Sequence, residues 1–207
     1  MKSLPDRIVI VGGGGHAKVV IATVRAAGGE VVAVYDDNQA RWGQQLLGAL
    51  IKGPIPDKTI EEAPAIIAIG DNRARRAAAE RIEAEWVTAC HPDAVVHPSV
   101  SLGPGTVVFA GVVVQPDTTI GAHSIINTAA SIDHDCVLGD YVHVAPGVCV
   151  CGGVTLGDGV LMGVGATACP TVRIGEGVVV GAGTVCVEDV ASGATVVGAP
   201  ARVVGRG

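Results

Sequence analysis

The stretch that decides the fold is residues 131–162, SIDHDCVLGDYVHVAPGVCVCGGVTLGDGVLM, where a large apolar residue recurs at every sixth position. The full set of fifteen such positions is Val96, Leu102, Val108, Val114, Ile120, Ile126, Ile132, Leu138, Val144, Val150, Leu156, Met162, Ala168, Ile174 and Val180. Fourteen are large aliphatic residues or methionine, with Ala168 the exception. This period predicts a solenoid of short parallel strands with the aliphatic side chains inside. About eighteen residues make one triangular coil, so the repeat predicts about five coils.

The composition fits a narrow interior. Hydrophobic residues make up 49% of the 207 residues, but aromatic residues only 2%. The residue four places after each aliphatic is small or β-branched, as in Thr106, Ser124 and Cys136, and we expect it to fill the tapering interior. The chain has 30 glycines without a collagen period, which indicates many tight turns.

The first part of the chain follows a different pattern. Short apolar segments at 7–11, 30–38 and 64–72 predict strands, and segments 16–28 and 73–86 predict helices. Strands that alternate with helices indicate a small parallel sheet, which binds ligands at the carboxyl ends of its strands. The predicted fold class is therefore an α/β Rossmann-like amino-terminal domain followed by a parallel β-helix.

Domain boundaries and charge complete this outline. We place the Rossmann-like domain at 1–89 and the solenoid at 90–207. The net charge of −6, with 14 basic residues, disfavours a nucleic-acid partner. No apolar stretch reaches the roughly 20 residues of a membrane span, and residues 1–15 hold no segment of signal-peptide length. We therefore expect a cytoplasmic protein without membrane insertion. The six cysteines lack the spacing of a zinc site, so we expect reduced packing residues and no metal.

The glycine-rich loop after the first strand admits two interpretations. Gly12, Gly14 and Ala17 fit the dinucleotide pattern G-x-G-x-x-G/A, and Asp36 and Asp37 lie at a suitable distance downstream. Taken alone, this pattern suggests NAD. A dehydrogenase would need a second domain for hydride chemistry, and here the second domain is a solenoid.

Several motifs resemble one known family. The segments VIVGGGGHAKVV (9–20), AIGDN (68–72), NTAASIDHDC (127–136) and VGAPARVV (197–204), together with the hexads, resemble hexapeptide-repeat sugar acetyltransferases. That family includes the bacillosamine-pathway N-acetyltransferase, the perosamine N-acetyltransferase and the sialic acid O-acetyltransferases. The resemblance covers essentially the whole chain. It implies a left-handed β-helix, acetyl-CoA as co-substrate, and a homotrimer with active sites where two prisms meet.

Acetyl transfer needs a base, an oxyanion donor and two bound substrates. Histidine suits the first role because its ordinary pKa lies near 6.5. The resemblance implies that His134 is the general base and Asp135 its partner. The alternative is that these two residues form only a polar turn.

The resemblance also implies two sets of binding residues. The residues implied for the nucleotide sugar are Gly14, His16, Asp36, Asp37, Gly70, Asn72 and His143. Those implied for acetyl-CoA are His143, Gly152, Ala182, Gly183, Pro200 and Arg202. Each has a plain alternative: His16 as a helix-start residue, His143 as a surface histidine, Gly152 as a turn glycine and Arg202 as a solvated side chain.

The resulting hypothesis is an acetyl-CoA-dependent N-acetyltransferase that acts on a nucleotide-linked 4-amino-4,6-dideoxy sugar. The paired acids after the second strand favour a UDP-linked over a GDP-linked substrate. One alternative is a sugar O-acetyltransferase of the sialic acid type. A second is a non-catalytic module that senses NAD or a nucleotide sugar and uses the solenoid for assembly.

Overall fold

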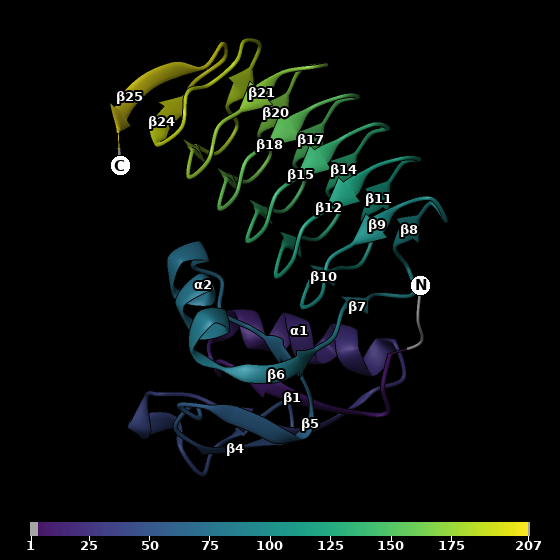
Figure 1. Cartoon of the computed structure of the whole chain (residues 1–207), viewed down its shortest axis with the longest axis vertical. Helices are drawn as coiled ribbons and strands as arrows, with labels where there is room; N and C mark the ends of the chain where they lie inside the picture. The colour runs from purple at the N-terminus through teal and green to yellow at the C-terminus, as the bar shows by residue number, and fades with distance from the viewer. Residues whose placement is uncertain (1–3, 207) are drawn as a thin grey trace.

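The computed structural model describes residues 4–206; the first three residues of the amino-terminal segment considered above, and residue 207, lie outside that range. The amino-terminal domain contains a six-stranded sheet in the order β3-β4-β2-β1-β5-β6 (Figure 1). All pairs are parallel except β3 with β4. The strands are β1 (Arg7–Val11), β2 (Glu30–Tyr35), β3 (Gln45–Leu46), β4 (Ala49–Gly53), β5 (Thr59–Ile67) and β6 (Glu83–Trp86).

Two helices connect these strands. They are α1 (Gly15–Ala26), between β1 and β2, and α2 (Asn72–Arg81), between β5 and β6; a 3-10 turn, η1 (Gln39–Arg41), follows β2. Strand order reverses at β1, because β2 lies on one side of it and β5 on the other. Ligand sites in such sheets lie outside the carboxyl ends of the strands at this reversal.

One predicted helix was too long. The expected helix over 73–86 ends at Arg81, and Glu83–Trp86 forms edge strand β6 beside β5. The physical reason is a change of period: Ile82 is buried, Glu83 and Glu85 are exposed, and Ala84 and Trp86 between them are half-buried. That alternation suits a strand whose one face is covered. The prediction also missed β4.

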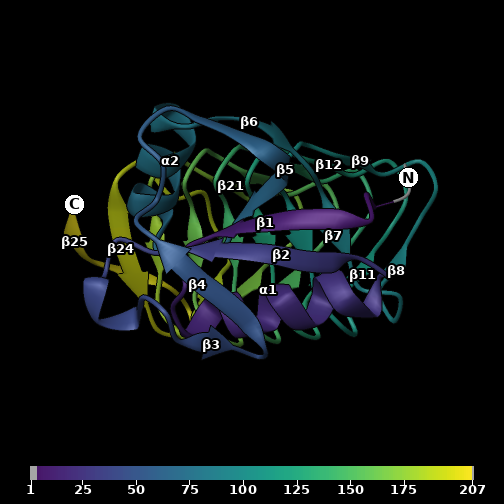
Figure 2. The ribbon, with the colours of Figure 1, turned by 90° about the horizontal axis from the view of Figure 1, so that it is seen from below.

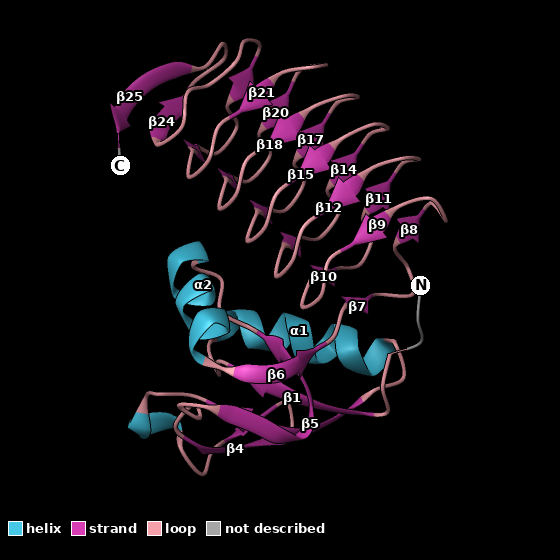
Figure 3. Ribbon diagram, in the orientation of Figure 1, coloured by secondary structure: helices cyan, strands magenta, loops and turns pink. Residues whose placement is uncertain are grey.

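The second domain is a parallel β-solenoid built from two-residue strands and turns (Figure 3). Its strands stack into three sheets, which we call faces A, B and C. Face A consists of β7 (Ala89–Cys90), β10 (Val107–Val108), β13 (Ile125–Ile126), β16 (His143–Val144), β19 (Leu161–Met162), β22 (Val179–Val180), β24 (Ala194–Val197) and the antiparallel β25 (Arg202–Arg206). Face B consists of β8 (Val95–Val96), β11 (Val113–Val114), β14 (Ser131–Ile132), β17 (Cys149–Val150), β20 (Thr167–Ala168) and β23 (Val185–Cys186). Face C consists of β9 (Ser101–Leu102), β12 (Thr119–Ile120), β15 (Val137–Leu138), β18 (Thr155–Leu156) and β21 (Arg173–Ile174).

The chain turns a corner between successive faces. Corner AB includes residues 127–130 and 181–184, corner BC includes 133–136 and 151–154, and corner CA includes 121–124, 139–142 and 157–160. Neighbouring strands of one face are eighteen residues apart, as for Val107 and Ile125. Face B has six strands, so the solenoid has about six coils, one more than the five predicted from the hexads. The difference arises because β7 and β23 continue the six-residue spacing at both ends, with Cys90 and Cys186 at the inward positions.

The solenoid core is aliphatic as predicted. All thirteen inward positions from Val108 to Val180 are buried, and Val96 and Leu102 in the first coil are half-buried. The small residue of each hexad is also inside; the Thr106 hydroxyl, for example, donates to a main-chain carbonyl of the next coil 2.7 Å away. Cys136 and Cys186 are buried in this core. Cys149 is exposed, unlike the packing role expected for all six cysteines, and all six are free thiols.

The amino-terminal domain packs on face A, with α1 between the small sheet and the coils (Figures 1 and 2). The outward side chains of Ala89, Val107 and Ile125 form one column on face A, and all three are buried in a cluster with α1. The last strand of the small sheet ends at Trp86, and the first strand of the solenoid, β7, begins at Ala89. The expected boundary between residues 89 and 90 therefore falls within β7. Within residues 4–206, no helix is both long and apolar enough to cross a membrane.

Candidate active site

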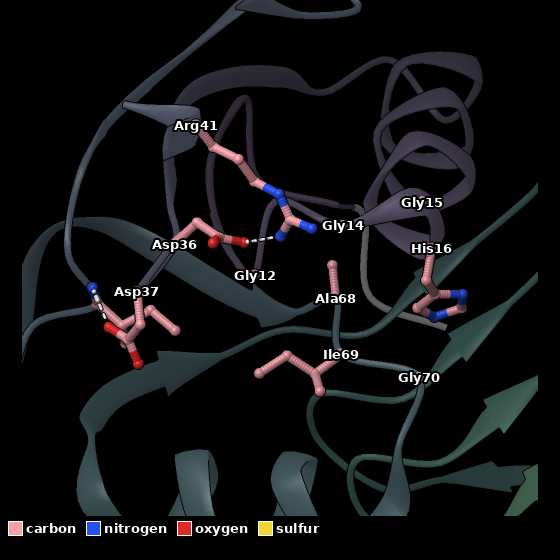
Figure 4. Close-up of a pocket in the computed structure, with 11 residues that line it drawn as sticks. Gly12, Gly14, Gly15, His16, Asp36, Asp37, Arg41, Ala68, Ile69 and Gly70 are labelled. Carbon is pink, nitrogen blue, oxygen red and sulfur yellow. Dashed lines mark hydrogen bonds and ion pairs between the residues drawn. The ribbon is translucent and has the colours of Figure 1, made fainter. Parts of the chain in front are cut away.

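The reversal point of the small sheet carries a pocket at the carboxyl ends of β1, β2 and β5 (Figure 4). The residues that line it are Gly12, Gly14, Gly15, His16, Asp36, Asp37, Arg41, Ile55, Ala68, Ile69 and Gly70. Five of them are sequence-predicted contacts. The glycines open α1, whose first N–H groups lack intrahelical partners, so the pocket presents a helix amino terminus to an anion.

The Asp36 carboxylate organises this pocket from within. One oxygen accepts from the Gly13 N–H at 2.6 Å and from Arg41 at 2.8 Å, and the other accepts from the Asn38 N–H at 2.8 Å. Burial alone would raise the pKa of Asp36, but these hydrogen bonds outweigh it and lower the pKa. Gly13 allows this close approach, because a Cβ would lie only 3.1 Å from the Asp36 carboxylate and would push it away from the loop. Asp36 therefore shapes the loop, with its acceptors already used by the protein.

Arg41 is a pocket residue that the sequence analysis missed. It follows β2 on the short turn η1, and its side chain reaches over the pocket beside Gly14 while paired with Asp36 (Figure 4). Its side chain is 40% exposed, so part of the guanidinium faces the cavity. Its position could not be anticipated, because the loop after β2 has no regular pattern. The cation and the helix terminus together favour a diphosphate.

His16 and His143 lie together at the edge of the pocket. Their ring centroids are 6.2 Å apart, and the His143 Nδ1–H donates to the Gly70 carbonyl at 3.2 Å. The His143 Nε2 then accepts from the Asn127 amide at 3.3 Å. Burial, followed by the nearby charge of Arg75, lowers the pKa of His143 to about 4. His143 is thus a half-buried neutral residue beside the pocket rather than a solvated surface histidine.

The His16 side chain carries an unpartnered polar atom. Its Nε2 is buried and no hydrogen-bond partner exists for it among the described residues. Burial, and then the neighbouring His143, lower the pKa of His16 to about 4. Asn72, by contrast, lies outside the pocket lining, and its amide binds protein atoms at both ends.

His134 and Asp135 form a dyad at corner BC. The His134 Nδ1 lies 2.7 Å from the Asp135 carboxylate, and the two side chains are 59% and 67% exposed. Asp135 has a positive φ of 58°, a conformation that aspartate tolerates better than most residues, and its short side chain can therefore turn back to the ring. The hydrogen bond to Asp135, and then the charge of Asp133, raise the pKa of His134.

Gly152 lies directly against the His134 ring in the next coil. A Cβ at this position would lie 2.8 Å from the His134 Cε1 and 2.9 Å from Nε2, so any larger residue would displace the ring from its present position. The equivalent position one coil later, Pro170, has no N–H, and the equivalent position one coil earlier is His134 itself, whose N–H donates to the Asp133 carboxylate at 2.9 Å. The Gly152 N–H donates to no acceptor within residues 4–206, so it remains available to a ligand beside the dyad.

The predicted acetyl-CoA residues fall into two groups. Gly152 lies at corner BC, whereas Ala182 and Gly183 lie exposed at corner AB. The loop that contains Pro200 covers the end of face B through hydrogen bonds to Val185, and Arg202 follows it on β25.

The two halves of the candidate site lie on different sides of one chain. In a three-faced prism, corner BC is opposite face A, and face A carries the amino-terminal domain with its pocket. His16, His143 and Gly70 therefore meet each other, while His134, Asp135 and Gly152 meet on the far edge. A single chain does not bring the dyad to the pocket.

Comparison with known proteins adds independent findings. Residues 7–82 match the family described as the PglD N-terminal domain. The whole chain is similar to a structure of a histidine-to-asparagine mutant of perosamine N-acetyltransferase from Caulobacter crescentus in complex with CoA and GDP-perosamine, with 40% identity, 96% of each chain covered and a TM-score of 0.85. It is similar to the acetyltransferase domain of PglB from Neisseria gonorrhoeae in complex with acetyl coenzyme A, with 35% identity, 96% and 99% of the two chains covered and a TM-score of 0.87.

A curated relative matches part of the chain. It is the UDP-N-acetylbacillosamine N-acetyltransferase of Bacillus subtilis, 36% identical over 115 residues, which are 50% of this chain and 51% of that protein. The chain thus spans about half the length of this curated relative, in contrast to its full-length match with the two solved structures.

Proposed function

The chain belongs to the hexapeptide-repeat family of nucleotide-sugar N-acetyltransferases, and from this premise we propose that it transfers acetyl from acetyl-CoA to the amino group of a nucleotide-linked 4-amino-4,6-dideoxy sugar. One observation carries the proposal. The same chain holds an anion-ready pocket at the amino terminus of α1 and an exposed His–Asp dyad beside an unpaired main-chain N–H.

In the proposed reaction, His134 is the base. Its Nδ1 is bound to the Asp135 carboxylate, which leaves the Nε2 lone pair to accept a proton. The sugar nitrogen forms a bond with the thioester carbonyl carbon as His134 takes the amine proton. The C–S bond then breaks, and the proton held by His134 passes to the departing sulfur, so that CoA leaves as the thiol and His134 is neutral again. The Gly152 N–H stabilises the oxyanion between these steps.

In the proposed binding mode, the pocket holds the nucleotide part of the sugar. The diphosphate meets the Gly14 end of α1 and the Arg41 guanidinium, Asp37 faces the base, and His16 with Gly70 faces the sugar. Acetyl-CoA lies along the coil between Gly152 and the residues at the carboxyl-terminal end, which are Ala182, Gly183, Pro200 and Arg202.

We propose that the functional unit is a homotrimer. The dyad and the pocket lie on opposite sides of one prism, so a second chain must supply one of them. In such an assembly, His134 of one protomer faces the pocket and His143 of its neighbour. His143, with its pKa near 4, would position the acceptor rather than accept its proton.

The alternatives are weaker on specific grounds. The NAD interpretation needs an acid for the ribose, and Asp36 already accepts from Gly13, Asn38 and Arg41, which leaves only the more exposed Asp37 for that role. The similarity of 96% of the chain to acetyltransferases also weighs against this interpretation. O-acetylation of a sialic acid type sugar is disfavoured, since the similar proteins named above are N-acetyltransferases. UDP remains our first candidate because of the paired acids, and GDP is the second because the perosamine enzyme was solved with GDP-perosamine.

The test is thiol release from acetyl-CoA with a panel of UDP- and GDP-linked 4-amino-4,6-dideoxy sugars. We expect acceptor-dependent release with one nucleotide strongly preferred. If none of the amino sugars in the panel supports thiol release and the protein binds NAD tightly, the sensing module would be favoured instead.

A further inference from the structure

Corner CA presents an array of carbonyl groups that the coil itself does not use. His123, Tyr141 and Gly159 occupy the same place in three successive coils, eighteen residues apart, and all three have positive φ values of 51°, 57° and 66°. No main-chain N–H among the described residues donates to their carbonyl oxygens. The start of α2 supplies all the donors that these oxygens receive.

Arg75 is the main donor. Its side chain is 1% exposed, and all five of its N–H groups are used. Nε donates to the His123 carbonyl at 2.7 Å, and one terminal nitrogen donates to the Tyr141 carbonyl at 2.9 Å and to the Asn72 side chain at 2.7 Å. The other terminal nitrogen donates to the carbonyls of Ile69 and Gly70, at 3.0 and 3.1 Å.

Asn72 extends the contact by one coil. Its amide nitrogen donates to the Gly159 carbonyl at 2.9 Å and to that of Val160 at 3.3 Å, while its oxygen accepts from Arg75. The helix start is itself fixed, because the Asp71 carboxylate caps it by accepting from the Ala74 N–H at 2.8 Å. Asn72 and Arg75 thus bind three coils of the solenoid from one rigid helix end.

Arg75 also contacts the wall of the nucleotide pocket. Ile69 and Gly70, which accept from Arg75, line the pocket, and the Gly70 carbonyl also accepts from His143 on face A. The guanidinium therefore joins the pocket wall to the coil through a single planar group. Other contacts between the domains include the apolar packing of α1 on face A, which is non-directional and does not fix an angle. The half-buried Arg76 also lies over the Tyr141 ring and pairs with Asp158 and Glu176 at 3.5 and 3.7 Å. These partly exposed ion pairs are longer than the Arg75 hydrogen bonds, so they constrain the angle less.

A buried guanidinium is a costly way to hold two domains together. Its desolvation opposes folding, and apolar residues of similar volume often stabilise such an interface as well or better. Burial lowers the pKa of Arg75 only to about 10, so the group stays charged at neutral pH. What the fork adds is direction, because each bond constrains both distance and angle.

We propose that Asn72 and Arg75 form a positioning clamp, which sets the orientation of the nucleotide pocket on the solenoid and so delivers the acceptor amine to the acetyl-transfer site. The clamp rests on the proposed function. Its two members are positioning residues, and neither binds the nucleotide sugar directly. This assignment differs from the role that the family resemblance implies for Asn72.

The test compares two acceptors in the full-length protein. One is the nucleotide-linked 4-amino sugar, which uses the pocket, and the other is the same amino sugar as its methyl glycoside, which does not. Remote binding energy orients the reacting group only when the pocket is held in place. In Arg75→Met we therefore expect kcat/KM for the nucleotide-linked sugar to fall about 10²-fold. The rate with the methyl glycoside, the acetyl-CoA KM and the Kd of the free nucleoside diphosphate should stay unchanged.

Two further variants sharpen the result. Arg75→Lys keeps the charge but loses the fork, so it should recover only a small part of the lost rate. Arg73→Met removes a charge from the exposed side of the same helix and should behave as wild type. If Arg75→Met does not fold, Asn72→Ala removes the bond to the Gly159 carbonyl and should show the same selective loss, at smaller size.

Equal losses with both acceptors would mean that Arg75 only stabilises the fold, and unchanged rates with both would mean that the clamp does not position the pocket. Either result overturns the inference. A wild-type protein that acetylates neither acceptor would instead overturn the proposed function, and the clamp's role in delivery would fall with it.

Discussion

His134 and His143 lie in consecutive coils, yet their environments move their pKa values in opposite directions. The Asp135 carboxylate raises the pKa of His134, whereas burial lowers that of His143 to about 4. A general base must be neutral before it can accept a proton. The two candidates therefore predict pH profiles that differ by more than two units, and the profile identifies the base.

The first prediction concerns this profile. With His134 as base, kcat rises with pH through a value above the ordinary 6.5 of histidine and levels off beyond it, because the raised pKa delays loss of the ring proton. His134→Ala should lower kcat by ~10²–10⁴-fold and remove that rise. A wild-type profile that is already flat from about pH 5 upward would instead implicate His143.

The second prediction concerns Asp135. Asp135→Asn removes the carboxylate that raises the pKa, so the rise in kcat should move to lower pH. The maximal rate should also fall, but by less than in His134→Ala, since the ring loses orientation and keeps its nitrogen. The kcat–pH profile measures both effects, and a midpoint that stays in place would show that Asp135 does not bind the ring in the working enzyme.

The third prediction is a double-mutant cycle between Gly152 and His134. Gly152→Ala places a Cβ within 2.9 Å of the ring, so it should displace the imidazole and lower kcat severely. In the His134→Ala background the same change should cost little, because the ring that it displaces is absent. If the free-energy effects of the two substitutions on kcat were additive, Gly152 would not act through the position of the His134 ring. Only the proposed role of its N–H at the oxyanion would then remain.

At the residue scale, the sequence could identify the dyad, but it could not show why particular residues surround it. His134 and Asp135 are adjacent and belong to a recognisable motif, so their prediction needed no tertiary information. The role of Gly152 as space for the ring depends on the next coil, and the burial of His143 depends on the domain packed above it. Arg75 looked like one of several charges on an exposed helix.

Among the elements, the strand ends of the small sheet build the pocket, and each contributes one kind of group. The end of β1 gives glycines and the start of α1, the end of β2 gives acids and Arg41, and the end of β5 gives the carbonyl of Gly70. Parallel strands bring these ends to one edge, which is why the sequence alone could predict five of the eleven residues that line the pocket.

The fourth prediction tests the pocket. Gly14→Val should fold, because a Cβ there has no neighbour nearer than Arg41 at 3.9 Å, but the side chain should block the diphosphate. The nucleotide-sugar KM should rise by at least about tenfold while the acetyl-CoA KM stays the same. Gly53→Ala is the control, since its Cβ also meets nothing within 4 Å and it lies outside the pocket.

Arg41→Met should act on the same quantity, raising the nucleotide-sugar KM about 10- to 100-fold through loss of a charged hydrogen bond. Arg41→Lys should recover part of the loss. Were Arg41→Met to leave this KM unchanged, the guanidinium would serve only to neutralise Asp36.

The elements were predicted where their period was regular. The hexads are a strict repeat, so thirteen core positions could be assigned without error. Strand β6 was lost in the predicted helix over 73–86, because Ala and Glu favour helices and the pairing with β5 that overrides this preference is a tertiary contact. The packing of the amino-terminal domain on face A could also have been predicted, because apolar residues on an outer face indicate that another element covers them. These residues are Ala89, Val107 and Ile125.

For the whole molecule, the proposed mechanism predicts that two chains share one site. Corner BC and face A are opposite each other in the prism, so His134 serves a pocket on another chain if the trimer forms. A monomer by light scattering at micromolar concentration would contradict this arrangement.

The fifth prediction is complementation between two inactive variants. One carries His134→Ala, and the other carries Gly14→Val with Arg41→Met. Mixed trimers isolated through two different tags should regain roughly a third of wild-type activity, because one of the three interfaces in each such trimer joins an intact dyad to an intact pocket. Activity no higher than that of the parent variants would place each whole site within one chain.

The central claim is that this chain forms an amide on a nucleotide-linked amino sugar, and the mass of the sugar product tests it most directly. We expect wild-type protein, acetyl-CoA and a UDP- or GDP-linked 4-amino-4,6-dideoxy sugar to give a product heavier by one acetyl group that survives a mild base wash. His134→Ala should give almost none in the same time. A product that loses its acetyl group in base would mean ester formation on oxygen, and an unmodified sugar across the whole panel would contradict the account.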